Sequence, residues 1–161
     1  MVIEDIFITP SAGQPMRRVA EAYAMMGRGL EGDRYALGTG YYSGKMECEV
    51  TLIEGEVLDT IEGLDGLSVY HGEHRRNLVT RGIALRDLEG QQLWIGDVVL
   101  GYDRPRPPCD YVQRLTEAGM TRALGKGPGI GARVLISGLL RAGAEIIVRP
   151  SPNARPKRRL P

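Results

Sequence analysis

The stretch that decides the fold class is QQLWIGDVVLGY, residues 91–102. Apolar and β-branched residues fill Gln91–Ile95 and Val98–Tyr102, and Gly96-Asp97 lies between them as a pair that favours a tight hairpin turn. The stretch therefore predicts two adjacent antiparallel strands. It also sets the pattern of short strands and glycine-rich turns that the rest of the chain follows.

Short strands recur on both sides of this hairpin, and helices are few. Strands are predicted at Val2–Thr9, Glu49–Ile53, His74–Thr80, Ala132–Ser137 and Ala144–Arg149. Helical spacing of apolar residues predicts a helix over Glu54–Ile61, and Asp110 suits the cap of a second helix that ends at Leu115. Because strands outnumber helices, we expect a mainly β fold, a barrel or sandwich with a few short helices attached.

Three segments are less defined. Met16–Met26 suits either a helix or a strand, because it mixes alanine and methionine with Val19 and Tyr23. Gly38–Gly44 holds three glycines and two tyrosines and predicts an exposed loop. Residues 150–161 hold four prolines and four basic side chains, so we expect a disordered tail after one domain that spans residues 1–149.

The charge balance argues against a nucleic-acid-binding protein. The chain has 161 residues and a net charge of +1, but its last eleven residues contain Arg155, Lys157, Arg158 and Arg159. The remaining residues carry 17 basic and 20 acidic side chains, whereas a nucleic-acid binder concentrates positive charge on its folded surface. A weak contact of the tail with nucleic acid or a membrane surface stays open as a minor alternative.

The sequence also predicts a cytoplasmic protein without a membrane anchor. Residues 1–25 lack the basic start and long apolar core of a secretory signal, and no apolar run approaches the roughly 20 residues needed to cross a bilayer. Cys48 and Cys109 are the only cysteines, too few for a disulfide framework, so we expect free thiols in a reducing compartment.

Several familiar motifs are absent or lack their proper context. Gly125–Gly131 is rich in glycine, but it follows no strand of a βαβ unit and lacks the Gly-Lys-Ser/Thr ending of a phosphate-binding loop. No Gly-x-Ser-x-Gly nucleophile motif is present. His71 and His74 have a spacing compatible with a metal ion, but two histidines alone in a glycine-containing loop are more often surface residues, and we favour that interpretation.

Cys109 is the strongest candidate for chemistry. It ends the segment Arg104-Pro105-Arg106-Pro107-Pro108-Cys109, and a helix is predicted to begin at the next residue. Arginines and a helix N-terminus both favour the thiolate, which is the form that attacks electrophiles and binds metals. The alternative is a buried, inert cysteine, which its polar surroundings disfavour. Cys48 lies between Glu47 and Glu49, which disfavour a thiolate, so we expect a structural role for it.

Two further segments supply groups that bind anions. In Gly29–Tyr35, Arg34 can clamp a phosphate or carboxylate with its planar guanidinium group, although a turn with an adjacent ion pair explains this segment more simply. On a strand at His74–Thr80, Arg75 and Asn77 share one face and suit a polar ligand that bears phosphate. An edge strand whose charges block aggregation explains the second segment equally well.

Taken in chain order, these segments resemble the MOSC domain, a family named for the C-terminal part of molybdenum-cofactor sulfurases. The resemblance covers the chain from about residue 2 to residue 149. The pieces that carry it are Gly29–Tyr35, Val50–Glu54, Arg75–Leu78, Arg81–Ile83, Ile95–Leu100, Pro108-Cys109 and Gly131–Leu135. The resemblance implies a β-barrel with attached helices. It also implies binding of the molybdenum cofactor, a pyranopterin dithiolene that holds molybdenum.

The resemblance assigns roles to individual residues. It implies that Cys109 is the thiolate ligand of molybdenum and a catalytic residue, and that Arg34, Arg75 and Asn77 hold the pterin and its phosphate. Similar enzymes reduce N-hydroxylated compounds such as hydroxylamino-purines and amidoximes, here with electrons from a separate donor protein. The family is also associated with pyridoxal phosphate binding.

Two points stay open at the level of sequence. The proton donor of such a reaction is not identified, and Asp33 and Asp110 are candidates because they adjoin the site segments. The chain could also be a carrier, with a persulfide on Cys109 or with the cofactor held for delivery to another protein. A protein-interaction domain that has lost its chemistry is the third alternative, and Cys109 together with the Arg-x-Asn pair argues against it.

Overall fold

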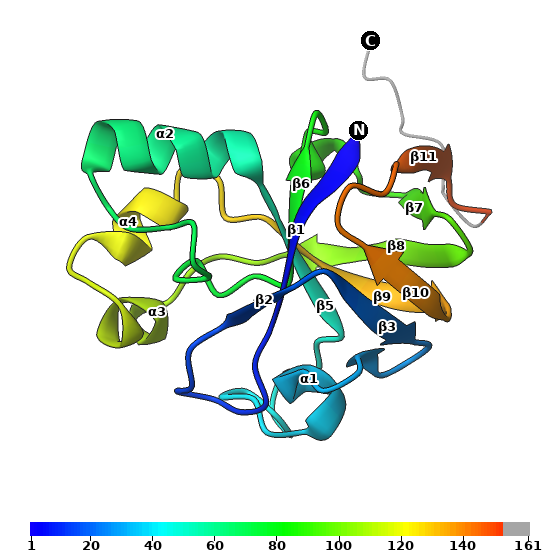
Figure 1. Ribbon diagram of the computed structural model, residues 1–161, viewed down its shortest axis with the longest axis horizontal. Helices are drawn as coiled ribbons and strands as arrows, with labels where there is room; N and C mark the ends of the chain where they lie inside the picture. Colours follow the sequence, from blue (N-terminus) through cyan, green and yellow to red (C-terminus); the bar gives the residue numbers. More distant parts are fainter. Residues whose placement is uncertain (153–161) are drawn as a thin grey trace, which may run out of the picture.

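The computed structural model describes residues 1–152, and strands dominate it (Figure 1). The strands are β1 (Val2–Ile8), β2 (Arg17–Val19), β3 (Glu21–Met25), β4 (Gly29–Leu30), β5 (Val50–Glu54), β6 (Leu78–Arg81), β7 (Gln91–Ile95), β8 (Val98–Pro105), β9 (Ile130–Ile136), β10 (Gly138–Arg141) and β11 (Ile147–Pro150). The helices are α1 (Arg34–Leu37), α2 (Gly55–Asp65), the short 3-10 helix η1 (Leu85–Asp87), α3 (Asp110–Leu115) and α4 (Met120–Leu124). The predicted mainly β fold with a few short helices is confirmed.

The strands form one large curled sheet and one small sheet. The large sheet has eight strands in the order β11-β7-β8-β9-β5-β6-β1-β2, and the small sheet has the order β10-β3-β4. Strands β5 and β6 pair in parallel, and the other ladders between the described strands are antiparallel. The curl of the large sheet makes a half-barrel, and the small sheet closes part of its open side (Figure 1).

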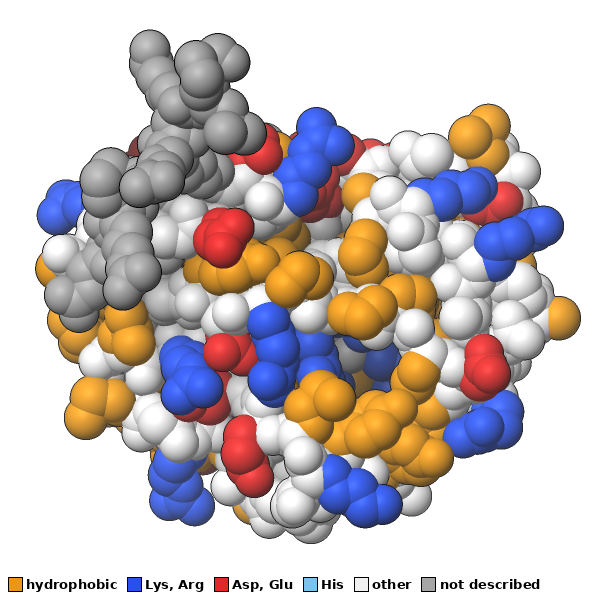
Figure 2. Space-filling model, turned by 180° about the vertical axis from the view of Figure 1, so that it is seen from behind, with side chains coloured by type: hydrophobic (Ala, Val, Ile, Leu, Met, Phe, Trp, Pro, Cys, Tyr) orange, Lys and Arg blue, Asp and Glu red, His pale blue; other side chains and the backbone are white. Residues whose placement is uncertain are grey.

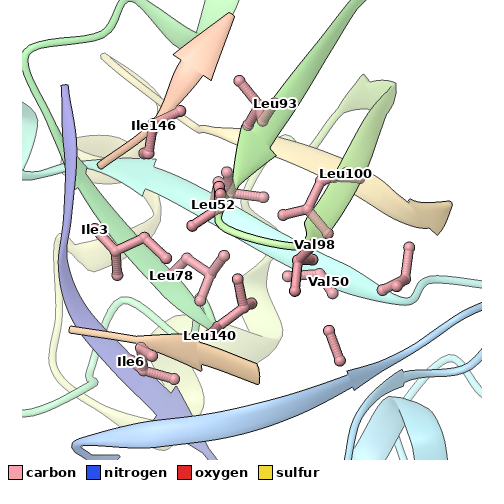
Figure 3. Close-up of a cluster of buried hydrophobic side chains, with 14 of the residues drawn as sticks. Ile3, Ile6, Val50, Leu52, Leu78, Leu93, Val98, Leu100, Leu140 and Ile146 are labelled. Atoms are coloured by element: carbon pink, nitrogen blue, oxygen red, sulfur yellow. The ribbon is translucent and has the colours of Figure 1, made fainter. Parts of the chain in front are cut away.

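Strands β5 and β6 are buried on both faces, which explains their nearly continuous apolar sequences. Successive residues of a strand point to opposite faces of the sheet. Leu52 and Leu78 therefore join the core inside the half-barrel, which Figure 3 shows, whereas Ile53 and Val79 join a second core on the outer face. That second core is completed by apolar residues of α2, α3 and α4, so these helices are fixed against the outside of the sheet.

Most strands lie where the sequence predicts them, and the hairpin at residues 91–102 is confirmed. Ile95 pairs with Val98 across the Gly96-Asp97 turn. The ambiguous Met16–Met26 segment forms strands β2 and β3. The sequence pattern missed the short elements α1, β4, α4 and β10, each of which is five residues long or less.

One predicted strand begins too early. The strand expected at His74–Thr80 starts only at Leu78, because the four residues before it form a turn in which Arg75 has a left-handed backbone with a φ of 60°. A left-handed residue interrupts the extended conformation that a strand requires. Arg75 and Asn77 consequently do not share a strand face.

Two other expectations concern the ends and the surroundings of the chain. The predicted tail begins at residue 150, and its residues 153–161 lie outside the described residues. Within residues 1–152, no helix has the length and apolar character needed to cross a membrane.

Candidate functional site

A cavity of about 410 Å³ lies where the α1 region, the turn before β6 and the β8–α3 connection meet. Its volume falls in the range of small-molecule sites. Cys109 lies in its wall, together with five arginines: Arg34, Arg75, Arg76, Arg104 and Arg106. No acidic side chain is among the described residues that line it. Figure 2 shows the hollow, with Lys and Arg side chains inside and beside it and hydrophobic side chains on its rim. The cavity therefore suits an anionic ligand with apolar parts.

Cys109 stands at the junction between a rigid connection and a helix. Pro107 and Pro108 precede it, and Cys109 is the extended residue that caps α3 without a capping hydrogen bond from its side chain. Cys109 is partly buried as a residue, and the Tyr42 hydroxyl donates a hydrogen bond to its Sγ atom over 3.2 Å. This hydrogen bond raises the pKa of Tyr42, so the phenol stays protonated at neutral pH.

Asp33 and Arg34 have different tasks, although both were predicted as site residues. Asp33 is fully buried and caps α1, where its carboxylate accepts hydrogen bonds from the backbone N–H groups of Thr9 (3.1 Å) and Tyr35 (3.2 Å). It also forms an ion pair with Arg34 over 3.1 Å. Arg34 lines the cavity, whereas Asp33 does not. Asp33 therefore positions Arg34 and lies away from the place where a ligand would bind.

Arg34 stabilises the turn that contains Arg75 through a hydrogen bond. Its Nη2 atom donates to the Arg75 carbonyl over 3.0 Å and to the Tyr35 hydroxyl over 3.2 Å, so most of its donors are used inside the protein. The Arg75 N–H donates to the Gly72 carbonyl over 2.9 Å. Gly72 has a φ of 95°, and a Cβ atom there would lie 2.5 Å from that of Met16. These contacts over-determine the left-handed conformation of Arg75, as is common where a side chain must be aimed at a site.

Arg75 keeps donors free for a ligand. One of its guanidinium nitrogens donates to the Gln14 carbonyl, and no other partner of that guanidinium group exists among the described residues. Burial, followed by the charge of Arg34, lowers the pKa of Arg75 from its usual value. Arg106 is also available, since its partners are the Met46 sulfur (3.3 Å) and the Tyr35 hydroxyl (3.4 Å).

Arg76 is structural, although it also touches the cavity. Its guanidinium group is buried and donates to the carbonyls of Pro128 (3.0 Å) and Arg106 (2.8 Å). Burial lowers the pKa of Arg76 to about 10. Its backbone N–H donates to Nδ1 of His74 over 3.0 Å. Arg76 thus fastens the turn before β6 to the connection that leads to Cys109.

The interpretation of both histidines as surface residues is wrong for His74. His71 is exposed, but His74 is fully buried against Phe7 with an edge-to-face contact of 5.2 Å. Burial and the neighbouring Arg76 charge lower the pKa of His74 to about 3, so the ring is neutral. Its Nδ1 atom accepts the Arg76 N–H, so Nε2 carries the proton. Its task is to support the turn, and in residues 1–152 no group of three or more His, Cys, Asp or Glu side chains could hold a metal ion.

Asn77 is not brought to the cavity. It is fully buried, and its amide accepts from the Thr51 N–H (3.1 Å) and hydroxyl (2.9 Å) and donates to the Phe7 carbonyl (3.1 Å). These bonds join the start of β6 to β5 and β1. The described geometry therefore gives Asn77 a structural task, in contrast to Arg75 two residues before it.

The aromatic side of the cavity was missed at the level of sequence. Tyr35, Tyr41, Tyr42 and Tyr111 all line it, and the rings of Tyr41 and Tyr111 stack at 3.9 Å between centroids with 16° between their planes. The two tyrosines of the Gly38–Gly44 loop were the available signal. The sequence of a loop does not indicate which distant segment its side chains will contact in the fold.

Two remaining candidates lie beside the cavity. Asp110 is exposed and does not line it. Cys48 is partly buried in the segment that leads to β5, and burial is the main cause that raises its pKa, while the Arg106 charge acts in the opposite direction. Burial, and not the neighbouring Glu47 and Glu49, is therefore the main reason why the Cys48 thiolate is disfavoured.

Comparisons with known proteins give a family match and similar folds. The family model described as MOSC domain matches residues 39–147. The YUAD protein from Bacillus subtilis is similar in structure, with a TM-score of 0.75 and 15% sequence identity over 92% of this chain and 95% of that one. YiiM from Geobacillus stearothermophilus has a TM-score of 0.67 and 18% identity over 92% of this chain and 74% of its own. YiiM from Escherichia coli has a TM-score of 0.63 and 18% identity, covering 92% of this chain and 70% of its own. No curated protein matches the chain in sequence.

Proposed function

The chain belongs to the MOSC domain family, and we propose that it binds the molybdenum cofactor at Cys109 and reduces N-hydroxylated compounds with it. The observation that carries this proposal is the thiol of Cys109 in an arginine-rich cavity that no acidic side chain of residues 1–152 lines. A soft thiolate is a suitable ligand for a thiophilic metal. Hydroxylamino-purines and amidoximes are the proposed substrates, and a separate protein is the proposed electron donor.

The residues of the cavity fit the cofactor. Cys109 would hold the metal, while the free donors of Arg75 and Arg106 suit the phosphate of the pterin, since guanidinium groups bind phosphate through paired hydrogen bonds. Arg34 adds positive charge and fixes Arg75. The residues do not suit pyridoxal phosphate, which enzymes hold as a Schiff base on lysine, because none of the lining residues described is a lysine.

The protein and the cofactor divide the work. When bound, the cofactor supplies the two-electron chemistry, and the protein supplies orientation and electrostatics. Tyr42 orients the Cys109 sulfur through its hydroxyl, and the tyrosine rings of the rim exclude water and contact flat, apolar parts of a ligand. Asp33 and Asn77 act indirectly, because they hold Arg34 and the turn before β6 in place.

Metal content and activity together test the proposal. The protein is expressed in a host that makes the cofactor, and molybdenum is measured by elemental analysis beside the reduction of a hydroxylamino-purine by reduced viologen dye. We expect the wild type to retain molybdenum and to form the amine, and Cys109→Ser to lose both. Cys48→Ser is the matched control and should keep both. Wild-type protein without molybdenum, or Cys109→Ser with undiminished metal and activity, would overturn the proposal.

A carrier function is the second candidate, and the same thiol environment favours it. A persulfide on Cys109 is an anion, so a hydrogen bond from the Tyr42 hydroxyl and the charges of the nearby arginines would stabilise it. Treatment with cyanide distinguishes the two functions. Release of thiocyanate from freshly purified wild type but not from Cys109→Ser, without reductase activity, favours the carrier.

A further inference from the structure

Residues 40–48, which we call the strap, line one side of the cavity with Tyr41, Tyr42 and Met46 and run between two firm anchors. At one end, the Thr39 N–H donates to the Arg34 carbonyl over 3.0 Å and its hydroxyl donates to the Pro10 carbonyl over 2.6 Å. At the other end, the Glu49 carboxylate accepts the Val134 N–H over 2.7 Å, and β5 begins at the next residue. The strap itself is therefore free to move only between these two points.

The main chain of the strap is not part of the hydrogen-bonded fold. Its backbone–backbone hydrogen bonds are internal, such as the one from the Met46 N–H to the Tyr42 carbonyl at 2.9 Å. No backbone–backbone hydrogen bond joins it to the rest of residues 1–152. A segment of this kind opens at a lower free energy than strands whose ladders must break.

Side-chain contacts fasten the strap to the opposite wall of the cavity, and one of them is a bond from the Arg104 guanidinium group to the Glu47 carbonyl. Tyr41 stacks on Tyr111, and Arg114 donates to the Tyr41 hydroxyl over 3.3 Å. Next to this stack, the Tyr42 hydroxyl lies 3.2 Å from the Cys109 sulfur. The strap therefore places a polar group on the very atom that an incoming ligand must reach.

We propose that the strap is a cover that opens to admit ligands to Cys109, and that the Tyr41–Tyr111 stack is its latch. The proposal goes beyond the cofactor assignment, because it concerns access of any ligand to the thiol and can be tested on cofactor-free protein. Opening breaks side-chain contacts while both anchors and the half-barrel stay intact. Tyr41 thus sets how often the thiol is accessible, and Tyr42 leaves the sulfur when the strap moves.

The rate at which iodoacetamide alkylates Cys109 measures this opening. All proteins carry Cys48→Ser, so Cys109 is the only thiol that reacts. We expect Tyr41→Ala to raise the alkylation rate roughly two- to tenfold, because an aromatic pair contributes about 0.5–1.5 kcal/mol and its loss shifts the open population accordingly. Tyr41→Phe keeps the ring and should stay near the parent rate. Tyr23→Ala removes an exposed ring on β3 and serves as the matched control.

Two results would contradict the cover. One is an unchanged alkylation rate in a Tyr41→Ala protein whose thermal unfolding matches the parent. The other needs no variant: amide hydrogen exchange of residues 41–47 in the wild type as slow as that of β5. We expect exchange in the strap to be at least about tenfold faster, since it has no ladder to protect it. Loss of molybdenum binding would leave both measurements unaffected, so the two proposals fail independently.

Discussion

Two walls of the cavity are held in opposite ways. One is the turn of His74–Asn77, which we call the floor, and the other is the strap. The turn of His74–Asn77 is buried, and its side chains bond to main-chain carbonyls of four other segments. The strap contacts the opposite wall through tyrosine rings and single hydrogen bonds. The difference shows how one site combines fixed arginines, which orient a ligand without reorganisation, with a wall that can let the ligand in.

Removing Arg76 should break the floor and have the largest effect. The Arg76→Ala substitution leaves the partly buried carbonyls of Pro128 and Arg106 without their charged donor. We expect the free energy of unfolding to fall by about 3 kcal/mol or more, measured by urea denaturation. Arg133→Ala removes an exposed ion pair with Asp103 and should change stability by less than about 1 kcal/mol. An Arg76→Ala protein as stable as Arg133→Ala would contradict the structural role of Arg76.

Acid should also lower the free energy of unfolding, because His74 in the floor is buried in its neutral form. Its pKa is about 3 in the folded protein and 6.5 in the unfolded chain, so the unfolded state binds more protons between these values. The contribution of neutral His74 is complete above pH 6.5 and is lost as the pH falls towards 3. We expect this residue to add up to about 1.4 kcal/mol of stability change per pH unit in that window.

Urea unfolding between pH 4 and 7 isolates this contribution when variants are compared. His74→Gln keeps a group that can accept the Arg76 N–H and cannot gain a charge, so its stability should depend less on pH than that of the wild type. His71→Gln changes an exposed histidine and should follow the wild type. Parallel curves for His74→Gln and wild type would show that the buried ring does not titrate as described.

Substitution of Arg75 should have the smallest effect on the free energy of unfolding and a clear effect on phosphate binding. Asparagine tolerates the left-handed backbone of this position, so we expect Arg75→Asn to change the free energy of unfolding by no more than about 1 kcal/mol. Phosphate binding, measured by calorimetry on cofactor-free protein, should weaken by a factor of roughly 10 to 150, because charge-assisted hydrogen bonds contribute about 1.5–3 kcal/mol each. Equal phosphate affinity of the two proteins would remove Arg75 from the binding groups.

Local sequence pattern was sufficient for the elements that local chemistry decides. The hairpin at Gly96-Asp97 lies where its turn residues predict it. The helix from Asp110 to Leu115 is also present, but its N-cap is Cys109, and the prediction that Asp110 caps it is wrong. The turn before β6 could not be predicted, because the left-handed Arg75 is imposed by Gly72 and by a bond from Arg34, far away in sequence. Tertiary contacts decided that position against its local preference for a strand.

The site was predictable only in part, because some of its contacts depend on tertiary packing. Cys109, Arg34 and Arg75 come together in one cavity, as the resemblance to the MOSC domain implied. The burial of Asn77 and His74 depends on β1 and β5 packing around them, which residue type alone does not reveal. The closeness of Tyr42 and Cys109, which are 67 residues apart, needs the fold as a whole.

The anchored strap has a consequence for how such a protein can be altered. Thr39 and Glu49 fix where the segment leaves and rejoins the fold, and the ladders of the half-barrel do not pass through it. Its length and sequence can therefore be exchanged at little thermodynamic cost, since doubling a flexible loop costs only about 0.6 kcal/mol. Grafting a strap from another protein of this architecture is a direct way to change which molecules reach the same thiol and arginines, with the rest of the chain left untouched.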